Sequence, residues 1–416
     1  MSRIDDLIKQ YCPNGVEYKE LQELFEMKYG YTPSKSNKKF WVNGAIPWFR
    51  MDDIRKNGTI LSESLQKVTE EAIKGDRLFP ANSIIIAIRA TIGEHALITV
   101  PHLANERFIS LSLKSAFSKK MDIRFVYYYC FVLDNWCLVN TKTSHFSSVN
   151  ITAFKRFKFP IPPLPVQQEI VDILDNFTKL EAELEAELEA RKKQYTYYRN
   201  TLLSFNKIGS NIKKESCFVR WRTLGEVGIF VRGHGLQKKD FTESGIGCIH
   251  YGQIYTHYGV YADQTKTFIS ESLAKKLRKA KKGNLVIATT SENDEDVCKA
   301  VAWLGDEEIA VSGDAYIYEH SLNPKYVSYF FQTDEFQKQK KTLITGTKVR
   351  RVSGDNMSKI NIPVPPLPVQ QEIVNILDKF DALVNDISIG LPAEITARRQ
   401  QYEYYRNQLL TFQEAM

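Results

Sequence analysis

Long apolar runs are missing from this 416-residue sequence, and no stretch approaches the roughly 18 uninterrupted apolar residues of a membrane-spanning helix. The first residues, among them Arg3, Asp5 and Lys9, lack the apolar core of a secretion signal. We therefore expect a cytoplasmic protein. The six cysteines are scattered, with no C-x-x-C pair and no Cys/His spacing of a zinc finger, so we expect neither a disulfide framework nor a structural metal.

Motifs of catalysis are also missing. The sequence has no NPPF- or DPPY-like tetrapeptide of amino-methyltransferases and no G-x-x-x-x-G-K-[ST] phosphate loop. The seven histidines form no nucleophile–base–orienter grouping, and the carboxylates lie mainly on expected helices, where a solvated face explains them. We expect a chain that is not an enzyme in isolation and that holds no cofactor and no metal of its own.

An internal repeat dominates what is present. The ten residues PPLPVQQEIV at 162–171 recur identically at 365–374, an offset of 203. A second matched stretch follows, in which Tyr195 and Tyr198 recur as Tyr402 and Tyr405 at an offset of 207. The preceding segments match more faintly, although the apolar runs at 84–87 and 285–288 occupy similar places. The two halves are therefore predicted to share one fold that carries two different surfaces.

Both repeated segments are predicted to be long helices. Each begins after a proline pair and carries one apolar stripe at a spacing of three or four residues over roughly 40 residues, a length typical of a coiled coil. The first contains the strong helix-forming run EAELEAELEA at 181–190. The second has Gly390, Leu391 and Pro392, which should kink the helix or restart it with Pro392 in its first turn.

Net charge alternates along the chain. Residues 1–160 carry 23 lysines and arginines against 16 aspartates and glutamates, and residues 206–362 carry 24 against 18. The helical segments are acidic, with 5 against 8 at 161–205 and 4 against 7 at 363–416. Surface variation explains any one segment, but two basic blocks of similar size favour two modules that each meet a polyanion.

These features predict an α+β protein of four parts. Mixed α/β globular modules at 1–160 and 207–362 alternate with helices at 161–206 and 363–416. If the helices pack as an antiparallel coiled coil, the tandem repeat becomes pseudo-twofold and its two basic modules suit two half-sites on a duplex. The repeated helices would also offer two equivalent docking faces, so we expect two copies of one partner.

The sequence resembles the DNA specificity subunits of type I restriction-modification systems over its whole length. The PPLPVQQEIV helix starts, the tail GLPAEITARRQQYEYYRNQLLTF from Gly390, and the module openings VEYKELQEL and VRWRTLGEV carry this resemblance. One departure is that the run at 181–190 replaces a second GLPAEI element.

The resemblance implies that 1–160 and 207–362 are target recognition domains reading a bipartite site in double-stranded DNA. It implies two modification (methyltransferase) subunits docked on the helices, with restriction subunits outside. S-adenosylmethionine is then expected in the modification subunit, and ATP and Mg²⁺ in the restriction subunit.

Base readout requires Arg, Lys, Asn, Gln, Ser, Thr or His on loops that reach a groove, with further cations on phosphates. The predicted DNA-binding residues of the first module are Lys28, Tyr31, Lys35, Lys38, Lys39, Trp48, Arg50, Arg89, Lys142, Ser144 and His145. Those of the second are Arg232, His234, Lys238, Lys239, His250, Tyr251, Gln253, Thr289, Ser291, Thr347, Lys348, Arg350 and Arg351. Trp48 is also a candidate for the core, and the basic run at 275–282 is predicted to be an exposed or phosphate-facing helix.

A second function remains open from the residues alone, namely a coiled-coil scaffold whose basic modules bind protein or RNA. Duplex binding that falls steeply with salt and prefers one split sequence would favour the DNA-reading function. Salt-insensitive association with an acidic protein would favour the scaffold.

Overall fold

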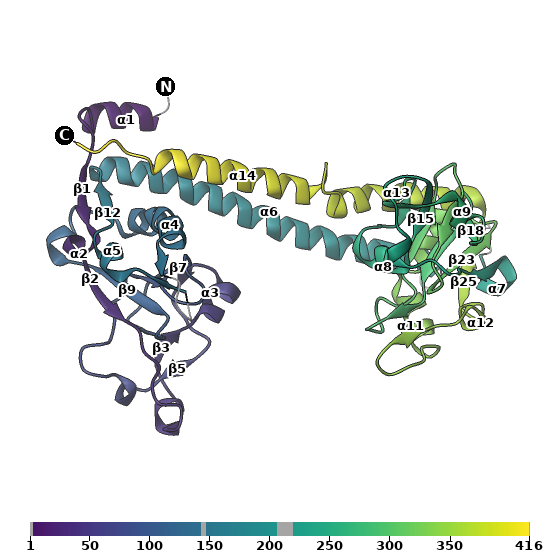
Figure 1. Cartoon of the computed structure of the whole chain (residues 1–416), viewed down its shortest axis with the longest axis horizontal. Coiled ribbons are helices and arrows are strands. Elements are labelled where there is room, and N and C mark those ends of the chain that lie inside the picture. The colour runs from purple at the N-terminus through teal and green to yellow at the C-terminus, as the bar shows by residue number, and fades with distance from the viewer. Residues whose placement is uncertain (1–2, 143–146, 206–218, 416) are drawn as a thin grey trace. The chain divides into compact units, whose positions relative to one another are not determined.

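The computed structural model describes residues 3–142, 147–205 and 219–415, and these form two compact units. Unit 1 comprises residues 1–183 and 396–416, and unit 2 comprises residues 184–395. The predicted boundary between residues 206 and 207 lies outside the described residues. Figure 1 traces the chain through both units.

Unit 1 begins with the elements of its globular module. In chain order they are α1 (Arg3–Tyr11), β1 (Glu17–Glu20), α2 (Leu21–Leu24), β2 (Phe25–Tyr29), the 3-10 helix η1 (Lys38–Phe40), β3 (Ile46–Phe49), α3 (Met51–Asn57), β4 (Ile60–Leu61), β5 (Lys67–Val68), η2 (Glu70–Ala72), β6 (Ser83–Ala87), β7 (His95–Ile98), β8 (Leu103–Ala104), β9 (Phe108–Leu113), η3 (Ser115–Phe117), α4 (Ile123–Val139), β10 (Thr141–Lys142), β11 (Ser148–Val149), α5 (Ile151–Lys155) and β12 (Lys158–Ile161). The helix α6 (Leu164–Ser204) contributes to both units.

Unit 2 repeats this pattern with some changes. Its elements are β13 (Arg220–Thr223), α7 (Leu224–Val227), β14 (Gly228–Arg232), η4 (Lys238–Asp240), β15 (Ile246–Ile249), α8 (Tyr251–Thr256), β16 (Tyr261–Ala262), β17 (Thr267–Ile269), α9 (Glu271–Ala274), β18 (Lys279–Ala280), β19 (Leu285–Ala288), β20 (Thr290–Ser291), β21 (Ala300–Trp303), β22 (Ile309–Val311), β23 (Ala315–His320), α10 (Pro324–Phe330), α11 (Asp334–Lys341), β24 (Arg350–Arg351), α12 (Gly354–Met357), β25 (Asn361–Val364) and α13 (Leu367–Asn385). The helix α14 (Leu391–Leu409) also contributes to both units, and Pro392 is its second residue, as the sequence predicts.

The two modules share one sheet topology. A five-stranded sheet has the order β2-β9-β6-β7-β4 in unit 1 and β14-β23-β19-β21-β16 in unit 2. A smaller sheet, β5-β3-β8 or β17-β15-β22-β18, accompanies it. The first and last strands of each module also pair, β1 with β12 and β13 with β25. The faint sequence repeat therefore corresponds to one fold used twice.

The central strands explain the apolar runs at 84–87 and 285–288. Ile84 and Ile86 of β6 face a core formed with α4 and α6, whereas Ile85 faces a second core formed with β3 and α3. In unit 2, β19 divides its side chains between two cores in the same way. Because both faces of these strands are buried, their sequence reads as a continuous apolar run rather than as an alternation.

Each module is attached to its helix by the same buried glutamine, the first of the QQ pair in the repeat. The Gln167 side chain, fully buried, accepts from Asp122 N at 2.8 Å and donates to Lys120 O at 2.8 Å and Pro162 O at 2.6 Å. Its counterpart in unit 2 is Gln370, which accepts from Asn323 N at 2.8 Å. Both glutamines therefore tie the start of the repeated helix to the residue that caps α4 or α10.

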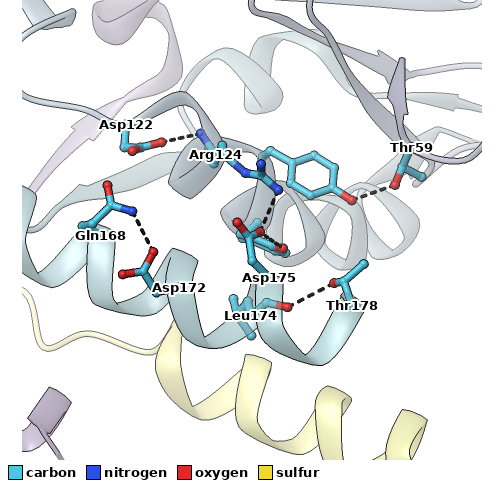
Figure 2. Close-up of polar contacts among 10 residues, drawn as sticks. Thr59, Asp122, Arg124, Gln168, Asp172, Leu174, Asp175 and Thr178 are labelled. Atoms are coloured by element: carbon cyan, nitrogen blue, oxygen red, sulfur yellow. Dashed lines mark hydrogen bonds and ion pairs between the residues drawn. The ribbon is translucent and has the colours of Figure 1, made fainter. Parts of the chain in front are cut away.

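An aspartate about two turns further along the helix completes this attachment. Asp175 on α6 accepts from Tyr128 Oη of α4 at 2.5 Å. It also pairs with Arg124 of α4 at 2.7 Å, as Figure 2 shows. In unit 2, Asp378 accepts from Tyr329 Oη at 2.7 Å and pairs with Lys325 at 2.8 Å. Burial is the main cause that raises the pKa of both tyrosines, and the bonded aspartate raises it further, so each remains a donor.

The helices pair within each unit. In unit 1, Phe177 of α6 packs on Tyr402 and Tyr405 of α14, and Glu181 pairs with Arg399, so the two helices run antiparallel. In unit 2, Phe380 of α13 packs on Tyr195 and Tyr198 of α6. The same repeat residues make both contacts. The start of each repeated helix therefore packs against the end of the other repeat, as predicted for an antiparallel coiled coil.

Candidate nucleic-acid interface

The candidate interface begins at the loop that follows the first strand of the five-stranded sheet. This loop leaves β2 at Gly30 in unit 1 and β14 at Gly233 in unit 2. Gly30 N donates to Phe108 O and Gly233 N donates to Ala315 O, which are equivalent bonds in the two modules. A β-carbon at either position would fall inside contact distance of backbone carbonyls on the chain after β8 or β22. Glycine is therefore required for the loop to pass this close.

In unit 2 the loop borders a hollow of about 500 Å³. Its lining includes Arg232, His234, Gln237, His250, Tyr251, Arg278 and Asp314. Arg232 Nε donates to Gly313 O at 2.9 Å, and Arg278 Nη1 donates to Arg232 O at 2.6 Å. These bonds to carbonyls hold the two guanidinium groups at the hollow, and Arg232 Nη2 also lies 3.9 Å from Asp314 Oδ1.

In unit 1 a hollow of about 310 Å³ lies at the same loop. It is lined by Lys35, Lys38, Trp41, Val42, Arg50 and Gln66. Arg50 caps α3, as His250 caps α8, so these two residues are equivalent in the fold. The Arg50 guanidinium lies 5.6 Å from the Trp48 ring centroid and 3.6 Å from Asp52. The hollow thus combines three cations with an aromatic wall.

The far border of the interface lies after the central strand. In unit 1, Arg89 bridges Ser148, and in unit 2, Thr290 pairs with Arg351 at the equivalent position. The turn between Thr345 and Arg351 exposes Thr347 and Lys348. Arg350 is fixed by two contacts: its Nη1 donates to Gly346 O at 2.7 Å, and its Nε lies 2.7 Å from Asp294 Oδ1.

Most of the predicted DNA-binding residues lie at the surface. The exposed ones are Lys35, Lys38, Lys39, Arg89, Arg232, His234, Lys238, Lys239, Thr347, Lys348 and Arg351. The partly exposed ones are Lys28, Arg50, Tyr251, Gln253, Ser291 and Arg350. Lys28 is engaged by Asp76 at 2.8 Å. Ser144 and His145 lie outside the described residues, as does the side chain of Lys142.

Four predicted readers are buried instead. Tyr31 and Trp48 pack in one core cluster, where Trp48 Nε1 donates to Tyr31 O at 3.0 Å and Tyr31 Oη donates to Ala72 O at 2.7 Å. Thr289 donates to Asp314 O, and the His250 ring accepts from Gly252 N. Because these polar groups are used inside the fold, the four side chains support the surface rather than contact a ligand.

Two further expectations need correction. The amide of Gln253 is occupied by His250 N at 2.9 Å and Thr267 Oγ1 at 3.0 Å, so it holds α8 in place. The basic run at 275–282 is not a helix, because α9 ends at Ala274 and the chain then turns into β18 at Lys279. Pairing of β18 with β22 in a sheet overrides the local helix pattern.

The electrostatics of the unit 2 hollow are set by its arginines. Burial, and then the nearby Lys238, lower the pKa of His250, so its imidazole stays neutral near pH 7. The cations Arg232 and Arg278 therefore supply the positive charge of the lining, which Asp314, 3.9 Å from Arg232 Nη2, partly offsets. Such a surface offers hydrogen-bond donors and positive charge, which suits phosphates and base edges.

Sequence reasoning missed two cations of this surface, Lys74 and Arg77, and it did not place Arg278 in the hollow. The Arg77 guanidinium lies 5.4 Å and the Lys74 ammonium 5.7 Å from the ring centroid of Tyr31, the second residue of the loop. Lys74 and Arg77 recur as Lys275 and Arg278 at an offset of 201, which is also the offset of the apolar runs. That offset could have identified them.

Among the residues that the structure describes, no helix has the length and apolar character needed to cross a membrane. In the same residues, no three or more His, Cys, Asp or Glu side chains come together as a metal site would require.

The family of this fold is shown by comparison with known proteins. The model of the type I restriction modification DNA specificity domain matches residues 13–190 and 219–397, so it matches twice and covers most of the sequence. The chain therefore belongs to this family.

Curated relatives carry the same description. The specificity subunit of the type I restriction enzyme EcoprrI of Escherichia coli is 50% identical over 238 residues, which are 55% of this chain and 58% of that protein. The EcoR124I/EcoR124II specificity subunit of Escherichia coli is 33% identical over 309 residues, 70% of this chain and 72% of that protein. The alignment with the first of these thus spans little more than half its length.

Solved structures share the fold. A chain from a type I restriction-modification system, solved in work on complex assembly and conformational transition, matches with a TM-score of 0.66 at 15% identity over 96% of this chain and 98% of that chain. The HsdS subunit of Thermoanaerobacter tengcongensis matches with a TM-score of 0.52 at 13% identity over 96% of each chain.

Proposed function

We propose that this chain is the sequence-reading subunit of a type I restriction-modification complex and that each unit reads one part of a bipartite DNA site. The observation that carries this proposal is the repeated interface. Equivalent loops and hollows occur in both units, yet Tyr31 is replaced by His234 and Arg50 by His250. One fold with two different polar surfaces suits two different base sequences. The family favours DNA over the alternative of a scaffold that binds protein or RNA.

Methyl transfer and DNA cleavage are assigned to partners. The curated relatives are specificity subunits of type I restriction enzymes, which supports a chain that is not itself an enzyme. We expect S-adenosylmethionine to bind the modification subunit, and ATP and Mg²⁺ to bind the restriction subunit.

The repeated helices support two copies of the modification subunit. Tyr197 and Tyr404 are equivalent and both exposed, at 64% and 57%, as are Leu164 and Leu367, at 44% and 56%. Exposed apolar side chains at equivalent places provide two like docking surfaces. Restriction subunits would add to that assembly, and the complex would act on chromosomal DNA in the cytoplasm.

Domain exchange tests the reading function. Residues 207–362 are replaced by the corresponding segment of a relative with a different site, and the methylome of a host carrying the chimera and the modification partner is sequenced. We expect one part of the methylated motif to change and the other to stay. The matched control exchanges residues 1–160 and should change the opposite part. If each exchange altered both parts, the units would not read independently.

A second experiment tests the division of labour. The purified chain is incubated with S-adenosylmethionine and host DNA, with and without the modification subunit. We expect methyl transfer only when both are present. Transfer by the chain alone would show that it is itself a methyltransferase.

A further inference from the structure

Four exposed cations occupy equivalent positions in the two units. Phe79 pairs with His102 beside β8, and Ala280 pairs with Ile309 in β22, which makes Phe79 and Ala280 equivalent. The central strands give the same offset of 201, because Ile84 and Leu285 pair with equivalent residues of β9 and β23. Arg77 is thereby equivalent to Arg278, and Lys74 to Lys275.

Both arginines approach the same part of the interface. In unit 1, Arg77 lies 5.4 Å from the ring centroid of Tyr31, the residue after Gly30. In unit 2, Arg278 donates to the carbonyl of Arg232, the residue before Gly233, at 2.6 Å. The neighbouring Lys74 and Lys275 are exposed in their units. Each pair thus places two positive charges beside the loop that opens the interface.

The positions around this pair differ between the units. The residue after the loop glycine is Tyr31 or His234, the helix cap is Arg50 or His250, and the first residue of that helix is Met51 or Tyr251. If the two units read different bases, the part of the ligand common to both is the sugar–phosphate backbone, which is the same at every sequence. A cation present in both units then serves the backbone, and a differing side chain that reaches the surface, such as Arg50 in unit 1 or His234 and Tyr251 in unit 2, serves the bases.

Packing in the core does not select these cations, because all four side chains are exposed. The lysines of the loop are likewise exposed cations present in both units, since Lys38 and Lys39 of η1 recur as Lys238 and Lys239 of η4.

We propose that Lys74 with Arg77, and Lys275 with Arg278, are phosphate-binding pairs that hold each recognition domain on duplex DNA regardless of sequence. This inference rests on the proposed function. It separates two classes of side chain in one surface, the repeated cations that position the domain and the differing residues that select the bases.

The test measures the salt dependence of DNA binding by the complex of this chain with its modification subunit. The probe is a duplex of random sequence, titrated between 50 and 200 mM KCl. Each phosphate contact contributes about 0.9 to the slope of log affinity against log salt. Replacing both cations of one pair, in the variant K74A/R77A or K275A/R278A, should lower the slope by about 1.8. Over this fourfold range of salt, the ratio of wild-type to variant affinity should then change about twelvefold.

A matched control removes two charges from the same segment. Lys281 and Lys282 are exposed, lie near Glu308 and Asp306, and stand where unit 1 has Pro80 and Ala81. The variant K281A/K282A should leave the slope unchanged. The methylated motif should be the same in wild type and in all three variants, whereas H234A should relax the motif with little change in slope.

The outcomes separate the inference from the proposed function. If the wild-type complex methylates no specific motif, the proposed function is wrong. If it methylates one but K275A/R278A relaxes that motif, or lowers the slope no more than K281A/K282A does, the phosphate assignment is wrong. Melting curves verify that each variant is folded.

Discussion

The buried glutamine of the repeat should be the most sensitive polar residue of the helix start. We consider Gln167→Leu, which keeps most of the volume of the side chain and removes its amide. Gln167 makes three hydrogen bonds, with Asp122 N, Lys120 O and Pro162 O. All three partner atoms lose their bond to the amide, and leucine takes the place of the buried side chain.

The magnitude follows from the number of these partner atoms. A buried polar group left without a partner costs about 1–3 kcal/mol. Taking about 1 kcal/mol for each of the three atoms, the free energy of unfolding should fall by about 3 kcal/mol. For a unit of about 200 residues, this corresponds to a melting temperature lower by about 6–12 °C. In unit 2, Gln370→Leu leaves two atoms, Asn323 N and Pro365 O, without their hydrogen-bond partner. It should lower the free energy of unfolding by about 2 kcal/mol.

Urea unfolding combined with hydrogen exchange at the start of α4 measures this effect. The neighbouring Gln168 provides the control, because it is exposed and its Nε2 donates to Asp172 on the same helix (Figure 2). Gln168→Leu should change stability by less than about 0.5 kcal/mol. If Gln167→Leu were no more destabilising than Gln168→Leu, the attachment of the module through this glutamine would be refuted.

Three further predictions concern acid, recognition and spacing. Burial lowers the pKa of His102 to about 4, so the free energy of unfolding should decline by about 3 kcal/mol as the pH falls from 6.5 towards 4. The variant H102Q should remove that decline in unfolding experiments, and an equal dependence on pH in the variant would contradict this. In Gly233→Ala the new methyl group meets Val311 O at 2.7 Å, which should displace the loop. The methylome should then show a weaker preference only in the part of the motif that unit 2 reads. An unaltered motif would argue against this loop as a reader. One additional LEAE unit within 181–190 lengthens α6 by about 6 Å and should add one or two base pairs to the unspecified spacer of the motif. An unchanged spacer in a fully active variant would mean that this segment does not set the distance between the recognition domains.

The sequence by itself determined the parts of the molecule that depend on local pattern. The exact PPLPVQQEIV repeat located both helix starts, because proline excludes helix before it and the apolar stripe continues after it. Gly390 and Pro392 located the break before α14. The apolar runs at 84–87 and 285–288 located the two central strands. The family resemblance rested on these same motifs and is confirmed by the matching family model.

Only the tertiary structure decided which polar residues reach the surface. Tyr31, Trp48, His250 and Thr289 have the chemistry of base readers, yet partners distant in sequence enclose them. The cations Lys74 and Arg77 recur in the sequence as Lys275 and Arg278, but only the structure placed Lys74 and Arg77 beside Tyr31 and showed by strand pairing that the two pairs are equivalent. Burial depends on contacts between segments far apart along the chain, and residue type and spacing carry no record of those contacts.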